Sequence, residues 1–293
     1  MKKGHISQKL CHLLFLEQSR RIYYNIICSH IFVKKDPVTM RKQFFKKLLY
    51  YGYRKLKGNL DYIRNCRSCT HIRKKDVVET LSHEPAFTEG FFFHDGTLYE
   101  SSGLRDRSFL FRYSDGFRKP VPEVFLEGCV ILHGRMYLLT YKNRVAFVLD
   151  KDTFEITERF PYEREGWGLT TDGTHLIASD GSDRIYYMDT EFQTVDSISV
   201  RDRKGPVRHI NELQYIDGII FANVWQTNII LAIDASTGEV IRKYYIHLKS
   251  KGIRFPNLNG IAYDGEYLYL TGKYYKDIWK IRADRFLDRS GQK

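Results

Sequence analysis

Five segments of the chain share one pattern of apolar and polar positions: an apolar run, a tight His-Gly or Asp-Gly turn, and a second apolar run. The segments read FFFHDGTLYES, CVILHGRMYLL, LTTDGTHLIAS, LQYIDGIIFAN and IAYDGEYLYLT, with turn glycines Gly96, Gly134, Gly173, Gly218 and Gly265. Successive turn glycines are 38, 39, 45 and 47 residues apart. A repeat of about 40 to 50 residues built from short strands is typical of β-propeller blades. The pattern therefore predicts an all-β fold, a five-bladed β-propeller.

Further β-rich stretches follow the paired strands of each repeat except the last, which ends at DIWKIRA without an outer strand. Propellers avoid an open sheet edge by full closure. The segment VVETLSH, just before Pro85, is the available donor for the missing strand. We therefore expect residues 76–293 to form one closed propeller domain.

Residues 1–75 lack the repeat and form a basic, aromatic-rich extension. They carry 19 Lys and Arg against three acidic residues, so the remaining 28 basic and 32 acidic residues leave the propeller slightly acidic. The net charge of +12 thus belongs to the extension. Within it, residues 40–57 read as a basic amphipathic helix, which can contact an anionic membrane, act in targeting, or pack against the propeller. We expect no nucleic-acid partner.

Four of the five cysteines lie in the extension. Cys66 and Cys69 have the CxxC spacing of a zinc half-site, but no second pair of ligands follows. The alternative interpretations are a local disulfide, a redox pair or inert thiols. No apolar stretch reaches the length needed to span a bilayer, and no clear signal peptide is present. These two features therefore predict no particular compartment.

The repeat also predicts which residues share one face of the propeller. The innermost strand of each blade begins on the face where the second strand ends. The first residues of the inner strands and the last residues of the second strands therefore meet around one opening of the central channel, called the mouth below. The residues collected there are Glu89, Glu127, Trp167, Asn211, Trp225, Asn259 and Lys273. Tryptophans and polar groups that converge in this way suit a pocket for a small ligand.

The motifs at this mouth resemble those of a known enzyme family. FTEG, LYESSGLRDRS, FLEG, EGWGLTTDG, INELQYIDG, ANVWQT, LNGIAYDG and TGK stand in the order and spacing of the plant and bacterial type of glutaminyl-peptide cyclotransferase, or glutaminyl cyclase. The resemblance runs from about Phe87 to Ile281. It implies a five-bladed propeller that converts the N-terminal glutamine of peptides or proteins to pyroglutamate and releases ammonia, with no cofactor and no metal.

The resemblance also implies roles for individual residues. Glu127 matches the catalytic acid/base of the family, and the matched pocket positions are Phe87, Phe125, Trp167, Asn211, Trp225 and Lys273. Two further pocket positions depart from the family pattern, which often has Gln in place of Glu89 and Trp in place of Tyr141. The family also often has Gly where Leu126 stands, beside the catalytic position.

Two other functions remain open beside a metal-independent cyclase. The departures at Glu89 and Tyr141 favour a catalytically impaired propeller that binds peptides or acts as a scaffold. A sugar- or lactone-processing propeller would need a metal-binding cluster in its channel. The resemblance implies an endomembrane or secretory setting, and we expect a monomer.

Overall fold

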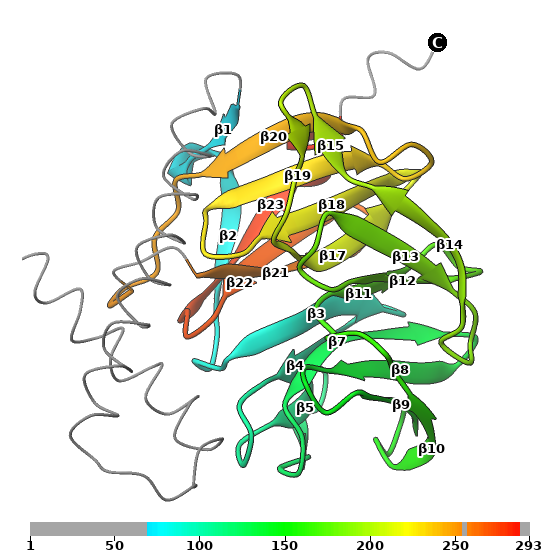
Figure 1. Cartoon of the computed structure of the whole chain (residues 1–293). Coiled ribbons are helices and arrows are strands. Elements are labelled where there is room, and N and C mark those ends of the chain that lie inside the picture. Colours follow the sequence, from blue (N-terminus) through cyan, green and yellow to red (C-terminus); the bar gives the residue numbers. More distant parts are fainter. Residues whose placement is uncertain (1–68, 254–256, 288–293) are drawn as a thin grey trace, which may run out of the picture. The chain divides into compact units, whose positions relative to one another are not determined.

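The computed structural model describes residues 69–253 and 257–287, and these form the predicted five-bladed β-propeller (Figure 1). Each blade is a sheet of four antiparallel strands. The first comprises β3 (Thr88–His94), β4 (Thr97–Ser102), β5 (Phe109–Arg112) and β6 (Phe117–Pro120). The second comprises β7 (Leu126–Leu132), β8 (Arg135–Thr140), β9 (Val145–Asp150) and β10 (Ile156–Pro161). The third comprises β11 (Leu169–Thr171), β12 (Leu176–Ser179), β13 (Arg184–Met188) and β14 (Thr194–Ser199).

The fourth blade comprises β17 (Ile210–Ile216), β18 (Ile219–Val224), β19 (Ile229–Asp234) and β20 (Val240–Ile246). The fifth comprises β21 (Leu258–Tyr263), β22 (Tyr267–Gly272), β23 (Asp277–Arg282) and β2 (Val77–Ser82). A small hairpin of β15 (Arg201–Asp202) and β16 (Gly205–Pro206) precedes the fourth blade, and the 3-10 turns η1 (Lys74–Asp76) and η2 (Ala283–Arg285) flank β2 and β23.

The turn dipeptides of the first, second and fourth blades have the backbone geometry of a tight two-residue hairpin. Asp95 and Gly96 both have positive φ, 47° and 73°, and His133 with Gly134 repeats this at 49° and 74°. Two central residues with positive φ define the type I′ turn, which joins antiparallel strands without splaying them. Glycine and a short polar residue tolerate this conformation, which explains why the phrase recurs in the sequence.

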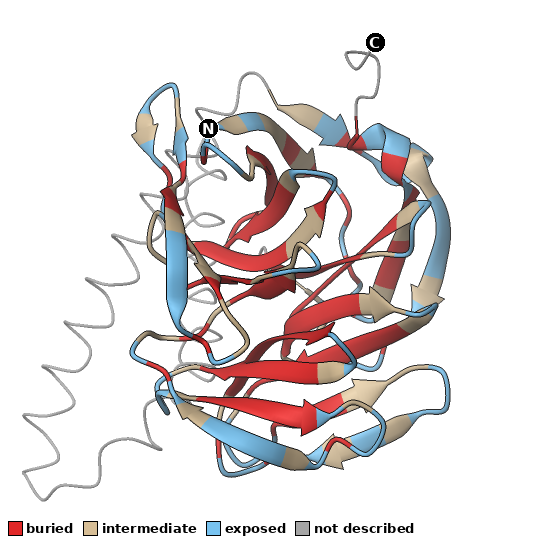
Figure 2. Cartoon of the chain, turned by 90° about the vertical axis from the view of Figure 1, so that its right-hand side faces the viewer, coloured by how far each residue is buried: buried red, intermediate tan, exposed pale blue. Residues whose placement is uncertain are grey.

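The core lies between the blades, around the innermost strands. All seven residues of β7 are buried. In the outer strand β10, by contrast, four residues are exposed and two are partly buried. Figure 2 shows the same gradient, with buried positions on the inner strands and exposed ones on outer strands and turns. Neighbouring inner strands contact each other in the ring β3, β7, β11, β17 and β21. Strands buried on both faces in this way need the continuous apolar runs seen in the sequence.

The ring closes as the sequence predicts. Strand β2 pairs antiparallel with β23, and Thr80 lies opposite Trp279. One pairing was not predicted: β1 (Thr70–Ile72) runs parallel to β20 at the outer edge of the fourth blade. This strand belongs to the stretch that the sequence analysis assigned to the extension, so propeller structure begins before residue 76.

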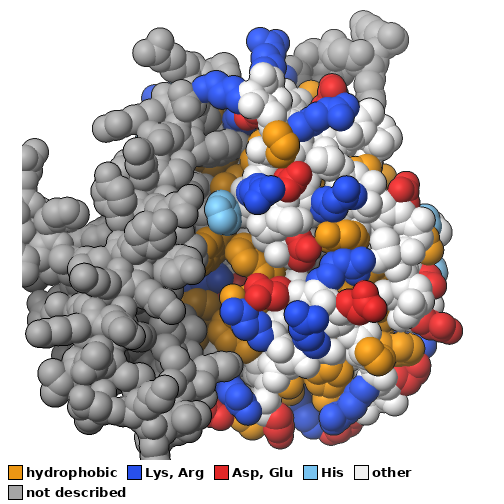
Figure 3. All heavy atoms as spheres, viewed as in Figure 1, with side chains coloured by type: hydrophobic (Ala, Val, Ile, Leu, Met, Phe, Trp, Pro, Cys, Tyr) orange, Lys and Arg blue, Asp and Glu red, His pale blue; other side chains and the backbone are white. Residues whose placement is uncertain are grey.

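The predictions for residues 40–57 and for most of the extension fall outside the described residues. Cys69, at the edge of the described part, is disulfide-bonded. Within the ranges that the structure describes, no helix has the length and apolarity to cross a membrane. Figure 3 shows basic and acidic side chains interspersed on one face of the propeller, which agrees with the small net charge of the repeats.

Candidate active site

The ladder between the first two strands is interrupted at the same place in four blades. The register shifts between Thr88 and Gly90, Leu126 and Cys129, Ile210 and Leu213, and Leu258 and Ile261. The residues that lie in these bulges are Glu89, Glu127, Gly128, Asn211, Glu212, Asn259 and Gly260. A β-bulge leaves residues outside the ladder and re-aims their side chains, often beside an active site. The predicted mouth residues Glu89, Glu127, Asn211 and Asn259 are therefore bulge residues, whereas Trp167 precedes β11.

Glycine follows the mouth residue in four blades because the inner strands nearly touch there. A Cβ on Gly128 would lie 2.3 Å from the Leu169 nitrogen, and one on Gly168 would lie 2.2 Å from the Asn211 oxygen. The Gly128 N–H donates to the Trp167 oxygen at 2.7 Å. These backbone contacts fix Glu127, Trp167 and Asn211 on adjoining blades.

We expect Gly128→Ala to destabilise the fold by at least about 2 kcal/mol, because its methyl group would force two backbones apart. Chemical denaturation of the variant measures this loss. Gly116→Ala is the control, since a Cβ there meets no atom within 4 Å and only the positive φ of 69° opposes it, at a cost of about 1 kcal/mol. Equal losses in the two variants would contradict the close approach of the inner strands.

A buried charged cluster lies at the bulges of the first, second and fifth blades. Lys273 Nζ is 2.6 Å from Glu89 Oε1, and Asn259 Nδ2 donates to Glu89 Oε2 at 3.1 Å. Asn259 Nδ2 also lies 2.8 Å from the Thr88 oxygen. The Glu89 and Glu127 carboxyl groups lie close enough for their charges to interact. Glu89 and Glu127 are 1% and 5% exposed, so the cluster is removed from bulk water.

The electrostatics of this cluster differ for its two carboxyl groups. Burial raises the pKa of both carboxyl groups. For Glu89, the Lys273 ammonium opposes this rise directly. For Glu127, the charge of Glu89 adds to burial and holds the pKa well above its ordinary range. Of the two carboxyl groups, Glu127 therefore has the stronger tendency to hold a proton.

Half-buried aromatic rings extend from this cluster. Lys273 Nζ lies 4.5 Å from the Phe87 ring centroid. Phe87 meets Phe125 at a centroid distance of 5.9 Å, and Phe125 meets Tyr141 at 5.6 Å. On the third and fourth blades, Trp167 and Trp225 are 5.7 Å apart in an edge-on arrangement. The Phe87, Phe125 and Tyr141 rings supply an apolar wall beside the charged cluster.

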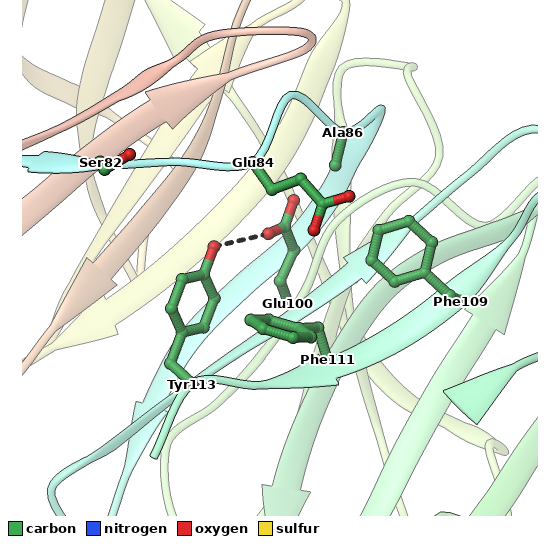
Figure 4. A pocket seen from close by; sticks show the side chains of 7 residues that line it. All are labelled: Ser82, Glu84, Ala86, Glu100, Phe109, Phe111 and Tyr113. Atoms are coloured by element: carbon green, nitrogen blue, oxygen red, sulfur yellow. Dashed lines mark hydrogen bonds between the residues drawn. The ribbon is translucent and has the colours of Figure 1, made fainter. Parts of the chain in front are cut away.

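A separate hollow lies between the segment after β2 and the first blade (Figure 4). Its volume is about 210 Å³, and it is lined by Ser82, Glu84, Ala86, Glu100, Phe109, Phe111 and Tyr113. Its charged groups are already paired within the chain. Glu100 accepts from Thr88 at 2.7 Å and from Tyr113 at 2.8 Å, while Glu84 lies 3.0 Å from Arg118. It contains none of the predicted site residues.

Comparison with known proteins identifies the family of this chain. The family model described as "Glutamine cyclotransferase" matches residues 58–283, which is most of the chain. The chain belongs to this family. The resemblance drawn from the motifs is thereby confirmed.

Two members of the glutamine cyclotransferase family show how similar this chain is to named relatives. The glutaminyl-peptide cyclotransferase of Arabidopsis thaliana is 31% identical over 238 residues, which cover 75% of this chain and 74% of the relative. The crystal structure of Myxococcus xanthus glutaminyl cyclase superimposes with a TM-score of 0.64 and 27% identity. That match covers 70% of this chain and 94% of the other.

Within this family member, the structure brings most predicted site residues together. Direct contacts join Phe87, Glu89, Glu127, Lys273, Phe125 and Tyr141, and a second contact joins Trp167 to Trp225. Asn211 is 2% exposed in the bulge of β17, and its backbone oxygen accepts from Ser179 Oγ at 2.8 Å.

Two residues at the site were missed as site residues. Tyr274 packs against Phe87 at a centroid distance of 5.4 Å and has a φ of 64°, unusual for an aromatic residue. Its place directly after Lys273 was the available signal. Glu212 stands where the other blades have glycine, and this break in the repeat was visible in the sequence. Among the described residues, no group of three or more His, Cys, Asp or Glu is arranged to hold a metal ion.

Proposed function

We propose that this chain converts the N-terminal glutamine of peptides or proteins to pyroglutamate and releases ammonia, by acid/base catalysis through Glu127. Membership of the glutamine cyclotransferase family supports the reaction. The observation that carries the mechanism is the buried Glu127 carboxyl group beside the Glu89–Lys273 ion pair, with a pKa that burial and the Glu89 charge raise.

The reaction is an attack of the substrate's α-amine on its own γ-carboxamide. A C–N bond to the amine forms, the C–N bond to the amide nitrogen breaks, and a five-membered lactam remains. Because nucleophile and electrophile belong to one residue, the enzyme needs no covalent intermediate. It must hold the side chain curled in a near-attack conformation and move one proton from the attacking to the departing nitrogen.

Glu127 is suited to move this proton. An α-amino group has a pKa near 8, so much of it is protonated at neutral pH, and the Glu127 carboxylate can bind the amine and take its proton. When the proton is on Glu127, the amine is free to attack. Glu127 then protonates the departing nitrogen and takes a proton from the attacking one, so ammonia leaves and Glu127 ends as it began. A pKa raised above the ordinary carboxyl range favours the uptake of this proton by Glu127.

The other residues bind and orient the substrate in this proposal. Asn211 and Lys273 would hydrogen-bond the carboxamide oxygen as it becomes negative. Phe87, Phe125, Tyr141, Trp167 and Trp225 form a slot for a glutamine side chain and exclude water. The peptide beyond the first residue then extends into solvent, so selectivity rests on the N-terminal glutamine.

Incubation of the purified full-length protein with a Gln-initiated peptide tests the function. We expect ammonia release and a product lighter than the substrate by the mass of ammonia. A matched peptide that begins with Asn is the control for pocket length. Turnover that persists after exhaustive chelation would support the metal-independent part of the proposal, whereas loss of turnover that added metal restores would overturn that part alone.

The second candidate function is a propeller that binds such peptides without turnover. The specific observation in its favour is that Glu89 forms an ion pair with Lys273 and interacts with Glu127. The proposed reaction uses both of these groups. Binding of the Gln-initiated peptide without ammonia release, measured by calorimetry on the same preparation, would select this function.

The same observation predicts the effect of Glu89→Gln, which restores the residue common in the family. The Glu89 charge raises the pKa of Glu127, so its removal lowers that pKa and leaves Lys273 free to face the substrate. We expect the acid limb of the pH profile of kcat/KM to move down by about one pH unit, with up to about tenfold higher activity at pH 6. An unchanged or upward-shifted limb would contradict the charge coupling.

A further inference from the structure

Three buried polar atoms beside the charged cluster have no hydrogen-bond partner within the described part of the chain. They are Glu212 Oε2, Asn223 Nδ2 and Asn259 Oδ1. The three residues are 1%, 0% and 1% exposed, so bulk water does not reach them. An unpaired buried polar atom costs about 1 to 3 kcal/mol, so three in one region require an explanation.

The three atoms belong to one junction between the fourth and fifth blades. Glu212 lies in the bulge of β17, between Ile210 and Leu213, which pair with Val224 and Ala222 on β18; Asn223 is the intervening residue of β18. Asn223 Oδ1 accepts from the Gly260 N–H at 3.0 Å, and the preceding residue is Asn259. The contacts therefore bring all three side chains to the same stretch of the channel.

This junction is connected to the proposed active site from two directions. Asn259 uses its amide nitrogen to hold Glu89 Oε2, so its free oxygen lies on the other side of the same carboxamide. Glu212 Oε1 accepts from the Phe91 N–H at 2.9 Å. Phe91 belongs to β3 in the first blade, and this blade is not a neighbour of the fourth blade, which contains β17. Glu212 therefore links two sides of the channel.

We propose that Glu212, Asn223 and Asn259 bind one internal water molecule beside the Glu89–Lys273 pair, and that Glu212 is a positioning residue that holds Glu89 through this water and Asn259. The kinetic part of the proposal rests on the proposed function. The donor and acceptor count fits one water. Asn223 Nδ2 donates to the water and Asn259 Oδ1 accepts from it, while Glu212 Oε2 makes the third hydrogen bond, as donor when protonated and as acceptor when ionised. Three hydrogen bonds are typical of a buried water.

The same count argues against a metal cation as the occupant. A cation needs acceptor oxygens, but the Asn223 group that lacks a partner is an N–H donor. An apolar occupant would leave all three groups unpaired. Water satisfies each of them and keeps the Asn259 carboxamide in the orientation that Glu89 requires.

Two substitutions of Glu212 separate positioning from charge. Glu212→Gln keeps an acceptor for Phe91 and a donor for the water, so we expect kcat to fall only about threefold. Glu212→Met has similar length but offers neither group. We expect kcat to fall by about 30-fold with KM changed less than about threefold, because the Glu89 side chain then leaves its place beside Lys273 and Glu127, whereas Glu89→Gln keeps all three side chains in place. The acid limb of the pH profile should also move in Glu212→Met, because displaced Glu89 no longer acts on Glu127. Glu239→Met, exposed in the same blade, is the control.

A crystal structure of the wild type and of Glu212→Met supplies the direct readout. We expect a density peak within hydrogen-bond distance of all three atoms in the wild type and its loss in the variant. An empty site in the wild type would overturn the water site. A folded Glu212→Met with wild-type kcat and pH profile would overturn the positioning role, as would a 30-fold loss in Glu212→Gln, which would show that an ionisable group is needed. If the wild type itself fails to turn over, the proposed function fails, and the density still decides the water site.

Discussion

Replacing Glu127 with glutamine is expected to lower kcat/KM for a Gln-initiated peptide by about 1,000-fold, within the range found for loss of a general acid/base. The amide has the shape of the carboxyl group and can donate a hydrogen bond, so the packing at this buried position is kept and the fold should be unaffected. It cannot give a proton to the departing nitrogen or take one from the attacking nitrogen. Steady-state rates of ammonia release across pH 5 to 9 measure the loss.

The control for this variant is Glu123→Gln, four residues earlier on an exposed position of the same approach to β7. It makes the same chemical change without touching the buried cluster, and we expect wild-type kinetics. Full activity of Glu127→Gln would remove Glu127 from the acid/base role. If its loss came with a matching fall in thermal stability, the loss would reflect misfolding, so both variants need a thermal denaturation curve.

The fold was predictable because its determinants are local in the sequence. The turn glycine of every blade has a positive φ, as in the Asp95–Gly96 and His133–Gly134 turns, and few other residue types allow this conformation. The repeated turn glycine therefore marks each blade in the sequence. The closing strand β2 was predictable because the last repeat lacked a partner. Strand β1 was not, since three residues that pair in parallel with an outer strand leave no periodic pattern.

The candidate site was predictable as a set of positions but not as a set of interactions. The repeat places Glu89, Glu127 and Lys273 at one mouth, yet the ion pair between Glu89 and Lys273 depends on which way bulge residues point. A bulge shifts side chains by one position, and its register is set by contacts between blades rather than by the strand itself. For the same reason, Glu212 was visible as a break in the glycine pattern, while its reach across the channel to Phe91 was not.

Replacing Lys273 with methionine is expected to lower kcat/KM by about 100-fold and the free energy of unfolding by about 3 kcal/mol, because a buried carboxylate loses its counterion. Lys273 Nζ is the only cation within salt-bridge distance of Glu89 among the described residues, and its side chain is 11% exposed. Methionine keeps most of the packing against Phe87. Ammonia release and chemical denaturation measure the two effects. Lys276→Met, an exposed neighbour, is the control.

The double variant Glu89→Gln with Lys273→Met separates the two roles of this lysine. Without a charge at position 89, the unpaired-carboxylate penalty disappears, so we expect stability to return to within about 1 kcal/mol of the wild type. If Lys273 also stabilises the developing negative charge on the carboxamide oxygen, activity stays about 100-fold low although stability recovers. Recovery of both would reduce Lys273 to a counterion of Glu89. The proposed mechanism predicts that the stability recovers in the double variant while the rate stays low, because only the rate depends on the transition state.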